Sequence, residues 1–164
     1  MIGSAMSKQD LSSELDDEYR SLLELVQDFG RDDFLKPGAA GTWTALDVFG
    51  HLAFWNSEAK KAIALALRGE RPDPWLVSDD EPVNAREQAQ RRSWPLPNVM
   101  DEFRRSILAL VAEISAASEP QLERESIHKA PDGSSANAAW VAERAIEHLR
   151  AHGEAIDIWL HTAA

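Results

Sequence analysis

Apolar side chains recur every three or four residues along four long stretches of the chain, the spacing that lines one face of an α-helix. These stretches predict helices over residues 8–29, 44–69, 98–117 and 136–161, and a shorter helix is predicted over 83–92. No stretch shows a convincing alternation of apolar and polar residues, the pattern of a half-buried strand. The sequence therefore predicts an all-α protein, a four-helix bundle.

Two long connections separate the later helices, at residues 70–97 and 118–135. Proline interrupts the first of them repeatedly, at Pro72, Pro74, Pro82, Pro95 and Pro97. Connections of this length are usually functional or cross over the fold, so we expect a bundle with long crossover connections. The earlier stretch 31–41 contains proline and two glycines and is predicted to be a loop.

The length of 164 residues predicts one domain, which we expect to span residues 8–164. A second methionine stands at position 6. Residues 1–7 are therefore expected to lie outside the domain, as a remnant of expression or as a disordered N-terminus.

The composition excludes several classes of function. The chain contains no cysteine, so it can form no disulfide, thiolate metal site or thiol nucleophile. Its net charge of -11 disfavours binding to the phosphate backbone of nucleic acids. No apolar run approaches the roughly 20 residues that span a bilayer, and the first residues do not resemble a secretory signal. We therefore expect a soluble cytoplasmic protein with no nucleic-acid or membrane partner.

Three of the five histidines fall on apolar stripes of predicted helices. His148 and His152 are four residues apart and so lie on one face of the last helix. His51 lies on the stripe of the second helix, whereas His128 is in a connection and His161 is near the C-terminus. If the three meet in the core they can bind one metal ion through nitrogen. The competing interpretation is that they are buried histidines held by hydrogen bonds.

Three imidazoles leave at least one coordination position open, as in catalytic sites. Imidazole suits Zn, Ni, Cu and Fe, so a divalent transition metal is predicted without its identity. Such an ion can lower the pKa of a bound water or activate a thiol. Asp47, Arg144 and Glu147 are candidates to support the ligands. For Asp47 the favoured role is a helix cap with Thr44, and the other two could simply be solvated.

Four tryptophans, Trp43, Trp55, Trp140 and Trp159, are expected to belong to the core and not to a ligand platform. Gly153 follows His152 inside the predicted last helix, where glycine costs about 1 kcal/mol against alanine. It either permits close helix packing or makes room beside the metal, and the sequence leaves both open.

At these residues the chain resembles the DinB/YfiT-like superfamily of metalloenzymes, which includes proteins of the ClbS/DfsB type. The resemblance rests on residues 41–48 leading into 51–55, on residues 83–85, and on His148 and His152 followed by Trp159. It implies a four-helix bundle in which one histidine of the second helix and two of the fourth hold a divalent metal. Those positions correspond to His51, His148 and His152.

The resemblance also implies an activity. Members are often dimers, some resemble transferases that use mycothiol or bacillithiol, and those of the ClbS type hydrolyse a reactive electrophile. The first hypothesis is thus a metal-dependent transferase or hydrolase, a homodimer that acts on a small electrophilic molecule, with a low-molecular-weight thiol as a candidate cosubstrate. The alternative is a non-catalytic bundle that binds a small molecule or a partner.

Overall fold

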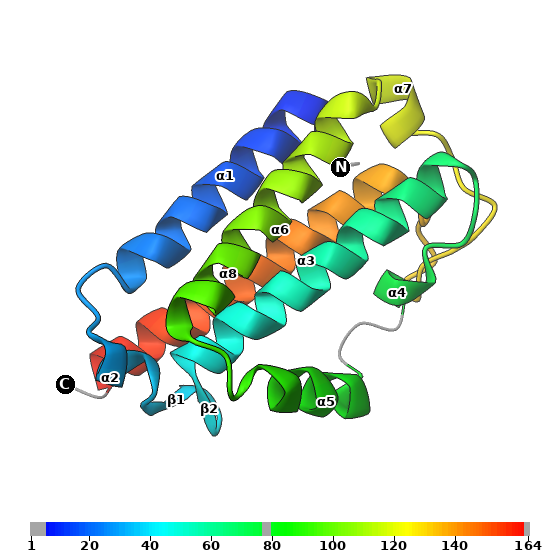
Figure 1. Ribbon diagram of the computed structural model, residues 1–164. Helices are drawn as coiled ribbons and strands as arrows, with labels where there is room; N and C mark the ends of the chain where they lie inside the picture. The colour runs from blue at the N-terminus through cyan, green and yellow to red at the C-terminus, as the bar shows by residue number, and fades with distance from the viewer. Residues whose placement is uncertain (1–5, 77–79, 163–164) are drawn as a thin grey trace.

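Four long helices lie side by side in the computed structural model, which describes residues 6–76 and 80–162 (Figure 1). They are α1 (Lys8–Leu25), α3 (Ala45–Leu67), α6 (Leu96–Ala116) and α8 (Ala138–Thr162). Helix α3 packs on α6 and α8, and α1 packs on the same two helices, so the four form a closed ring around one core. The predicted all-α four-helix bundle is confirmed.

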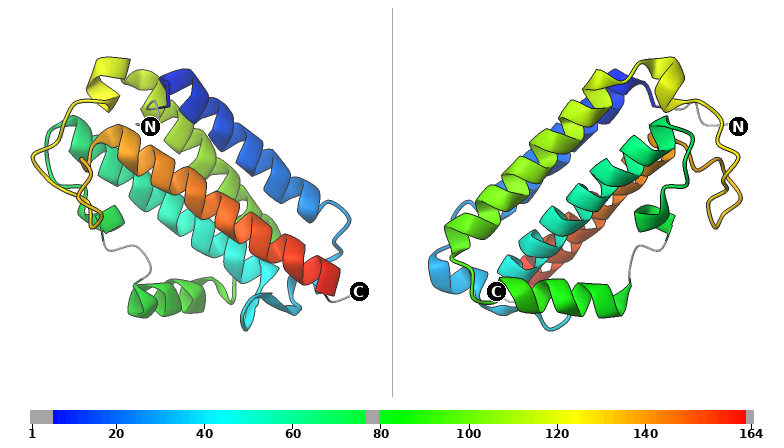
Figure 2. Two further views of the ribbon diagram at one scale, coloured as in Figure 1. Left: turned by 180° about the vertical axis from the view of Figure 1, so that it is seen from behind. Right: turned by 45° about the vertical axis from the view of Figure 1, so that its right-hand side comes forward.

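The direction of the helices explains the first long connection. Helices α3 and α6 run the same way, so the chain between them has to return along the whole bundle (Figures 1 and 2). It does so through two further helices, α4 (Asp73–Leu76) and α5 (Glu81–Arg91). The second long connection contains α7 (Glu119–Leu122) but stays at one end, because α8 runs back against α6. Only the first connection crosses over the bundle.

Capping boxes start two of the long helices. The Thr44 hydroxyl oxygen accepts a hydrogen bond from the Asp47 amide (3.1 Å), and the Asp47 carboxylate accepts one from the Thr44 amide (3.0 Å). Ser7 and Asp10 repeat the arrangement at the start of α1. Ser7, which we expected outside the domain, is thus the N-cap of α1, and Met6 packs against the core. Residues 1–5 of that expected segment lie outside the described residues.

The stretch 31–41, which was predicted to be a loop, contains regular structure. It forms α2 (Arg31–Phe34) and β1 (Pro37–Ala40), and β1 pairs antiparallel with β2 (Trp43–Thr44). Gly41 turns the hairpin with a positive φ of 62°. So short a pair carries no recognisable alternation, which is why the sequence did not predict it. Helix α1 also ends at Leu25, earlier than expected, because the next amides bond carbonyls three residues back.

Helix α5 is fastened to the bundle by a half-buried ion-pair cluster. Arg91 donates through two nitrogens to the Glu102 carboxylate on α6 (2.8 Å each) and through a third to Glu87 (3.0 Å). Its side chain is 12% exposed, and it lies where a Cβ at Gly50 of α3 would stand, 2.8 Å from the Arg91 Cδ. A glycine at position 50 therefore lets α5 approach the helix that carries His51.

The core between the helices is apolar, and its largest fully buried members come from all four long helices. They include Leu15, Leu22, Phe49, Leu52, Phe103, Leu110, Leu149 and Ile156. Within the described residues, no helix is both long and apolar enough to cross a membrane.

Candidate metal centre

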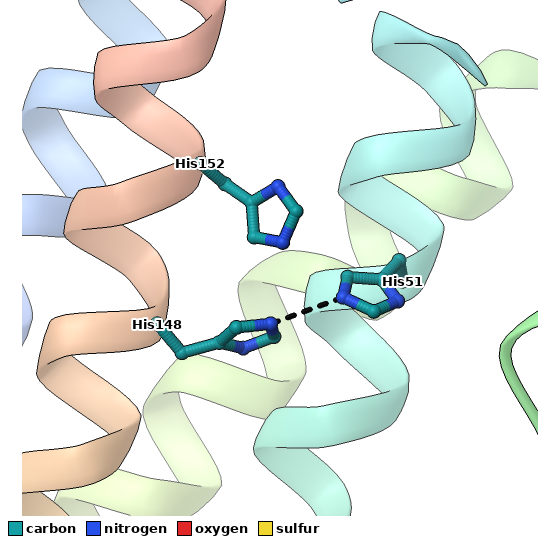
Figure 3. A group of neighbouring side chains, drawn as sticks. All are labelled: His51, His148 and His152. Carbon is teal, nitrogen blue, oxygen red and sulfur yellow. Dashed lines mark hydrogen bonds between the residues drawn. The ribbon is translucent and has the colours of Figure 1, made fainter. Parts of the chain in front are cut away.

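Three imidazole rings from two helices converge at one side of the core (Figure 3). His148 and His152 project from successive turns of α8 toward His51 on α3. One nitrogen from each ring lies within 4.8 Å of the others, and the Nε2 atoms of His51 and His148 are 3.0 Å apart. The structure thus brings together the three histidines that the sequence singled out.

Local sequence determines each half of this cluster. The four-residue spacing of His148 and His152 places them one above the other on α8. The capping box at Thr44 sets the start of α3 and therefore the direction in which His51 points, two turns later. What brings the halves together is the packing of α3 against α8.

The surroundings keep the rings of His51 and His148 neutral. Burial, together with charge repulsion from His148, His152 and Arg91, lowers the pKa of His51 from 6.5 to about 2. Burial, followed by repulsion from His152, lowers the pKa of His148 to about 3. Neutral imidazole is the form that binds a metal. At neutral pH, His51 and His148 are therefore uncharged, so each can offer a nitrogen lone pair to a metal ion.

The cluster could hold a divalent transition metal. Two nitrogens that share a tetrahedral zinc ion lie about 3.3 Å apart, close to the 3.0 Å between His51 and His148, and because the nitrogens of the cluster are up to 4.8 Å apart, the rings would have to draw together around an ion. The Nδ1 atom of His148 is buried and has no hydrogen-bond partner in the part of the chain that the structure describes. A histidine that binds a metal through one nitrogen carries its proton on the other, and a carboxylate, a backbone carbonyl or a water molecule usually accepts a hydrogen bond from it.

Aromatic rings enclose the cluster on two sides. Trp43 of β2 meets the His51 ring edge-on at 5.1 Å between centroids. On the other side Trp55 of α3 lies 6.4 Å from His51, and Trp75 of α4 lies 5.9 Å from His148. The expectation that Trp55 belongs to the core is met, since it is buried. Trp43 and Trp55 also form part of the wall of the histidine cluster.

The groups proposed to support the ligands are engaged elsewhere. The Asp47 carboxylate accepts hydrogen bonds from Thr44 in the helix cap. Glu147 pairs with Arg144 at 2.7 Å. Glu147 also lines a cleft of about 760 Å³ whose other walls include Glu14 of α1 and Trp140.

Gly153 lies on the α1 side of α8. A Cβ there would contact Leu22 of α1 at an ordinary 3.7 Å. Of the two roles left open for this glycine, room beside the metal finds no support, and an alanine would also fit the helix packing.

Trp75 escaped sequence analysis, and Asn84 was noted only within the stretch 83–85 that carries the family resemblance, without a role. Both lie in the crossover connection, which repeated prolines interrupt. Asn84 of α5 is buried and accepts a hydrogen bond from the Trp55 indole (2.8 Å). A tryptophan between two prolines, in a connection otherwise rich in charge, was the only signal for Trp75.

Fold and site together define a four-helix-bundle protein whose core carries a cluster of three histidines. The chain belongs to the DinB superfamily, whose family model matches residues 14–156. Its fold is also similar to that of a mycothiol-dependent maleylpyruvate isomerase, known from a crystal structure of a histidine-to-alanine mutant. The TM-score is 0.73 at 11% sequence identity, over 92% of this chain and 61% of that chain. The chain thus spans less than two thirds of that enzyme. A comparison with curated protein sequences finds no match.

Proposed function

We propose that this protein is a metal-dependent enzyme that acts on a small electrophilic molecule, with His51, His148 and His152 holding a divalent transition metal such as Zn, Ni or Fe. The observation that carries the proposal is the convergence of three imidazoles from two helices beside tryptophan rings, with His51 and His148 kept neutral by burial. Membership of the DinB superfamily and the fold of the isomerase agree with an enzyme of this kind.

The cluster favours a thiol cosubstrate over water as the nucleophile. When bound there, a divalent ion would supply a Lewis acid that lowers the pKa of a coordinated thiol or water. The carboxylates expected near the ligands are engaged elsewhere, Asp47 in the helix cap with Thr44 and Glu147 with Arg144. Neither is therefore placed as a general base. A thiol, with an ordinary pKa near 8.5, needs such a base less than water does. We therefore place transfer to a low-molecular-weight thiol ahead of hydrolysis.

The chain's own residues would orient the reactants and exclude water. Trp43 approaches the cluster from the hairpin, and Trp55 and Trp75 approach it from the opposite side. The hydrogen bond from Trp55 to Asn84 holds α5 against this wall. Such an enclosure lowers the local dielectric and protects a reactive electrophile from bulk water.

Metal content tests the proposal directly. Protein purified without an affinity tag should contain about one equivalent of a transition metal, or take it up on addition, by elemental analysis and titration. His148→Ala should weaken metal affinity by more than about 100-fold, because a ligand is lost outright. His161→Ala is the matched control, since His161 is an exposed histidine on the same helix. A wild-type protein that takes up no transition metal would contradict the proposal.

A second candidate, a non-catalytic bundle that binds a small molecule or partner, is favoured by one observation. The 3.0 Å contact between His51 and His148 is also a hydrogen bond that satisfies both nitrogens without any ion. The two functions separate in a screen of electrophiles with added thiols such as mycothiol. Loss of turnover in His148→Ala with an unchanged unfolding midpoint supports the enzyme, whereas a change of stability alone supports the bundle.

The homodimer implied by the family resemblance and the cytoplasmic location expected from the composition complete the proposal. Light scattering of the purified protein measures the first, and fractionation of cells that express it measures the second.

A further inference from the structure

Helix α5 lies outside the ring of the four long helices and is attached to it by few side chains (Figures 1 and 2). All eleven of its residues, Glu81–Arg91, are described, and of these only Asn84 is buried. Val83 adds a partly buried contact with the core. Helix α3, by comparison, buries twelve residues. An element with so little buried apolar surface opens at a lower free energy than the core beside it.

Two polar anchors fix α5 on α3. At one anchor, the Asn84 carboxamide oxygen accepts a hydrogen bond from the Trp55 indole at 2.8 Å. At the other, the Arg91 side chain lies against Gly50, where an added Cβ would be 2.8 Å from the Arg91 Cδ. Carboxylates on α5 itself and on α6 hold the Arg91 guanidinium in this place. The anchors are seven residues apart, so they hold α5 to α3 over about 10 Å of its length.

His51 lies between these two anchors on the surface of α3. Successive residues of an α-helix are rotated by about 100°, so His51 points about 100° away from Gly50, and Trp55 about 140° in the same sense. The direction of His51 therefore falls within the sector of α3 that α5 spans. The His51 ring lies 6.4 Å from the Trp55 ring, and His51 is only 8% exposed. Helix α5 thus covers the half of the histidine cluster that α3 contributes.

We propose that α5 is a strap that opens from α3 as one unit, with Arg91 on Gly50 as its latch, and that this opening sets how fast ligands enter and leave the histidine cluster. The inference rests on the proposed function, because it adds a control of access to the proposed metal site. When the strap opens, the anchors at Arg91 and Asn84 break together, and His51 and Trp55 become accessible from the α5 side. The four long helices stay folded, because the largest buried side chains lie between them.

Hydrogen exchange of the purified protein tests the strap without any assay of activity. The hydrogen bond to Asn84 protects the Trp55 indole N–H, so its exchange reports on the same opening as the backbone amides of α5. The protection factors of the two should agree and lie at least about 100-fold below those of the buried amides of α3 and α6. A Trp55 N–H that exchanges only as slowly as those core amides overturns the strap.

Two substitutions loosen the latch from opposite sides. Arg91→Met removes the charged head and keeps the apolar stem, whereas Gly50→Ala keeps every charge and places a methyl group where the Arg91 stem lies. Each should lower the protection of the Trp55 N–H and of the α5 amides by the same factor, about 10-fold or more, and leave α6 and α8 unchanged. Arg86→Met is the matched control. Arg86 is an arginine of α5 that is 62% exposed and pairs with Glu87, so its loss should change neither.

The comparison of these variants decides between a latch and a surface helix that frays. Equal protection of the Trp55 N–H in Arg91→Met and Arg86→Met overturns the latch. An Arg91→Met protein in which exchange rises only at the end of α5, with Trp55 unchanged, overturns opening as one unit. If Gly50→Ala does not fold, Arg91→Met and its control decide by themselves.

Zinc kinetics test the control of access. In Gly50→Ala the rate constants of zinc uptake and of zinc release to a chelator should rise by the same factor as the exchange of α5, and Kd should stay within about 2-fold of the wild type. Rate constants that do not change, or a changed Kd with an unchanged uptake rate, overturn this part. A wild type that binds no zinc contradicts the proposed function, and hydrogen exchange still decides whether α5 opens as one unit.

Discussion

Helix α3 has two buried faces that differ in chemistry. Toward α6, Phe49 packs edge-on against Phe103 at 5.0 Å, both fully buried. The polar contact there is the Asn56 amide on the Ser106 hydroxyl (3.1 Å). Toward α8, the same helix presents His51 to two more imidazoles, with tryptophan rings around them.

The face of α3 toward α6 thus serves stability, and the face toward α8 carries the candidate site. Large apolar side chains that interlock supply most of the free energy that holds a bundle together. Imidazoles kept neutral by burial supply little, and they cost desolvation. A protein keeps such groups in its core when a ligand uses them, and here the apolar face of α3 provides the stability that the histidine face gives up.

Truncation of the apolar face should give the largest effect on folding. Phe103→Ala removes a fully buried aromatic ring and should lower the free energy of unfolding by about 3–5 kcal/mol in urea denaturation. Leu108→Ala on the same helix is the control, because Leu108 is 55% exposed and should cost less than about 0.5 kcal/mol. The folded fraction of Phe103→Ala should still bind metal. Lost metal binding in that fraction would show that the two faces are coupled.

Acid should weaken the histidine face before it affects the rest. Burial holds the pKa of His51 at about 2 and that of His148 at about 3. In the unfolded chain both titrate near 6.5. Below about pH 6.5 the unfolded chain therefore binds protons that the folded protein does not bind. The free energy of unfolding decreases as the pH is lowered.

For metal-free protein we expect a loss of about 4–5 kcal/mol between pH 6.5 and 4.5, roughly half of it from each histidine, above the range in which most carboxyl groups titrate. The double variant His51→Gln/His148→Gln should be nearly flat over this range in chelator-treated samples. Equal slopes for the two proteins would show that these histidines are not buried in neutral form.

The smallest expected effect has the opposite sign. Gly153→Ala places a methyl group against Leu22 at an ordinary contact distance and removes the flexibility of a helical glycine. Thermal or urea unfolding should show a gain of about 0.5–1 kcal/mol. Metal affinity should not change, since this position faces α1 and not the histidines. Weaker metal binding would instead restore the role of Gly153 beside the metal.

Sequence periodicity predicted the long helices well because each has a wide apolar stripe that repeats for many turns. It located α3 through the Thr44 and Asp47 cap, which the structure confirms. It missed the hairpin of β1 and β2, since four residues of proline, glycine and alanine hold no period. In the crossover it found α5 but not α4 with Trp75, because four residues, one of them proline, are too few to show a helical repeat.

The sequence and the tertiary structure thus determined different features of this protein. The sequence by itself determined the helices, the absence of thiolates, and the identity of the three histidines, since these follow from local spacing and composition. Only the tertiary structure decided that His51 meets His148 and His152, because that depends on how α3 and α8 pack across 97 positions of chain. It also decided which tryptophan finds an acceptor for its indole N–H: hydrogen-bond partners are chosen by proximity in space, and no local pattern records them.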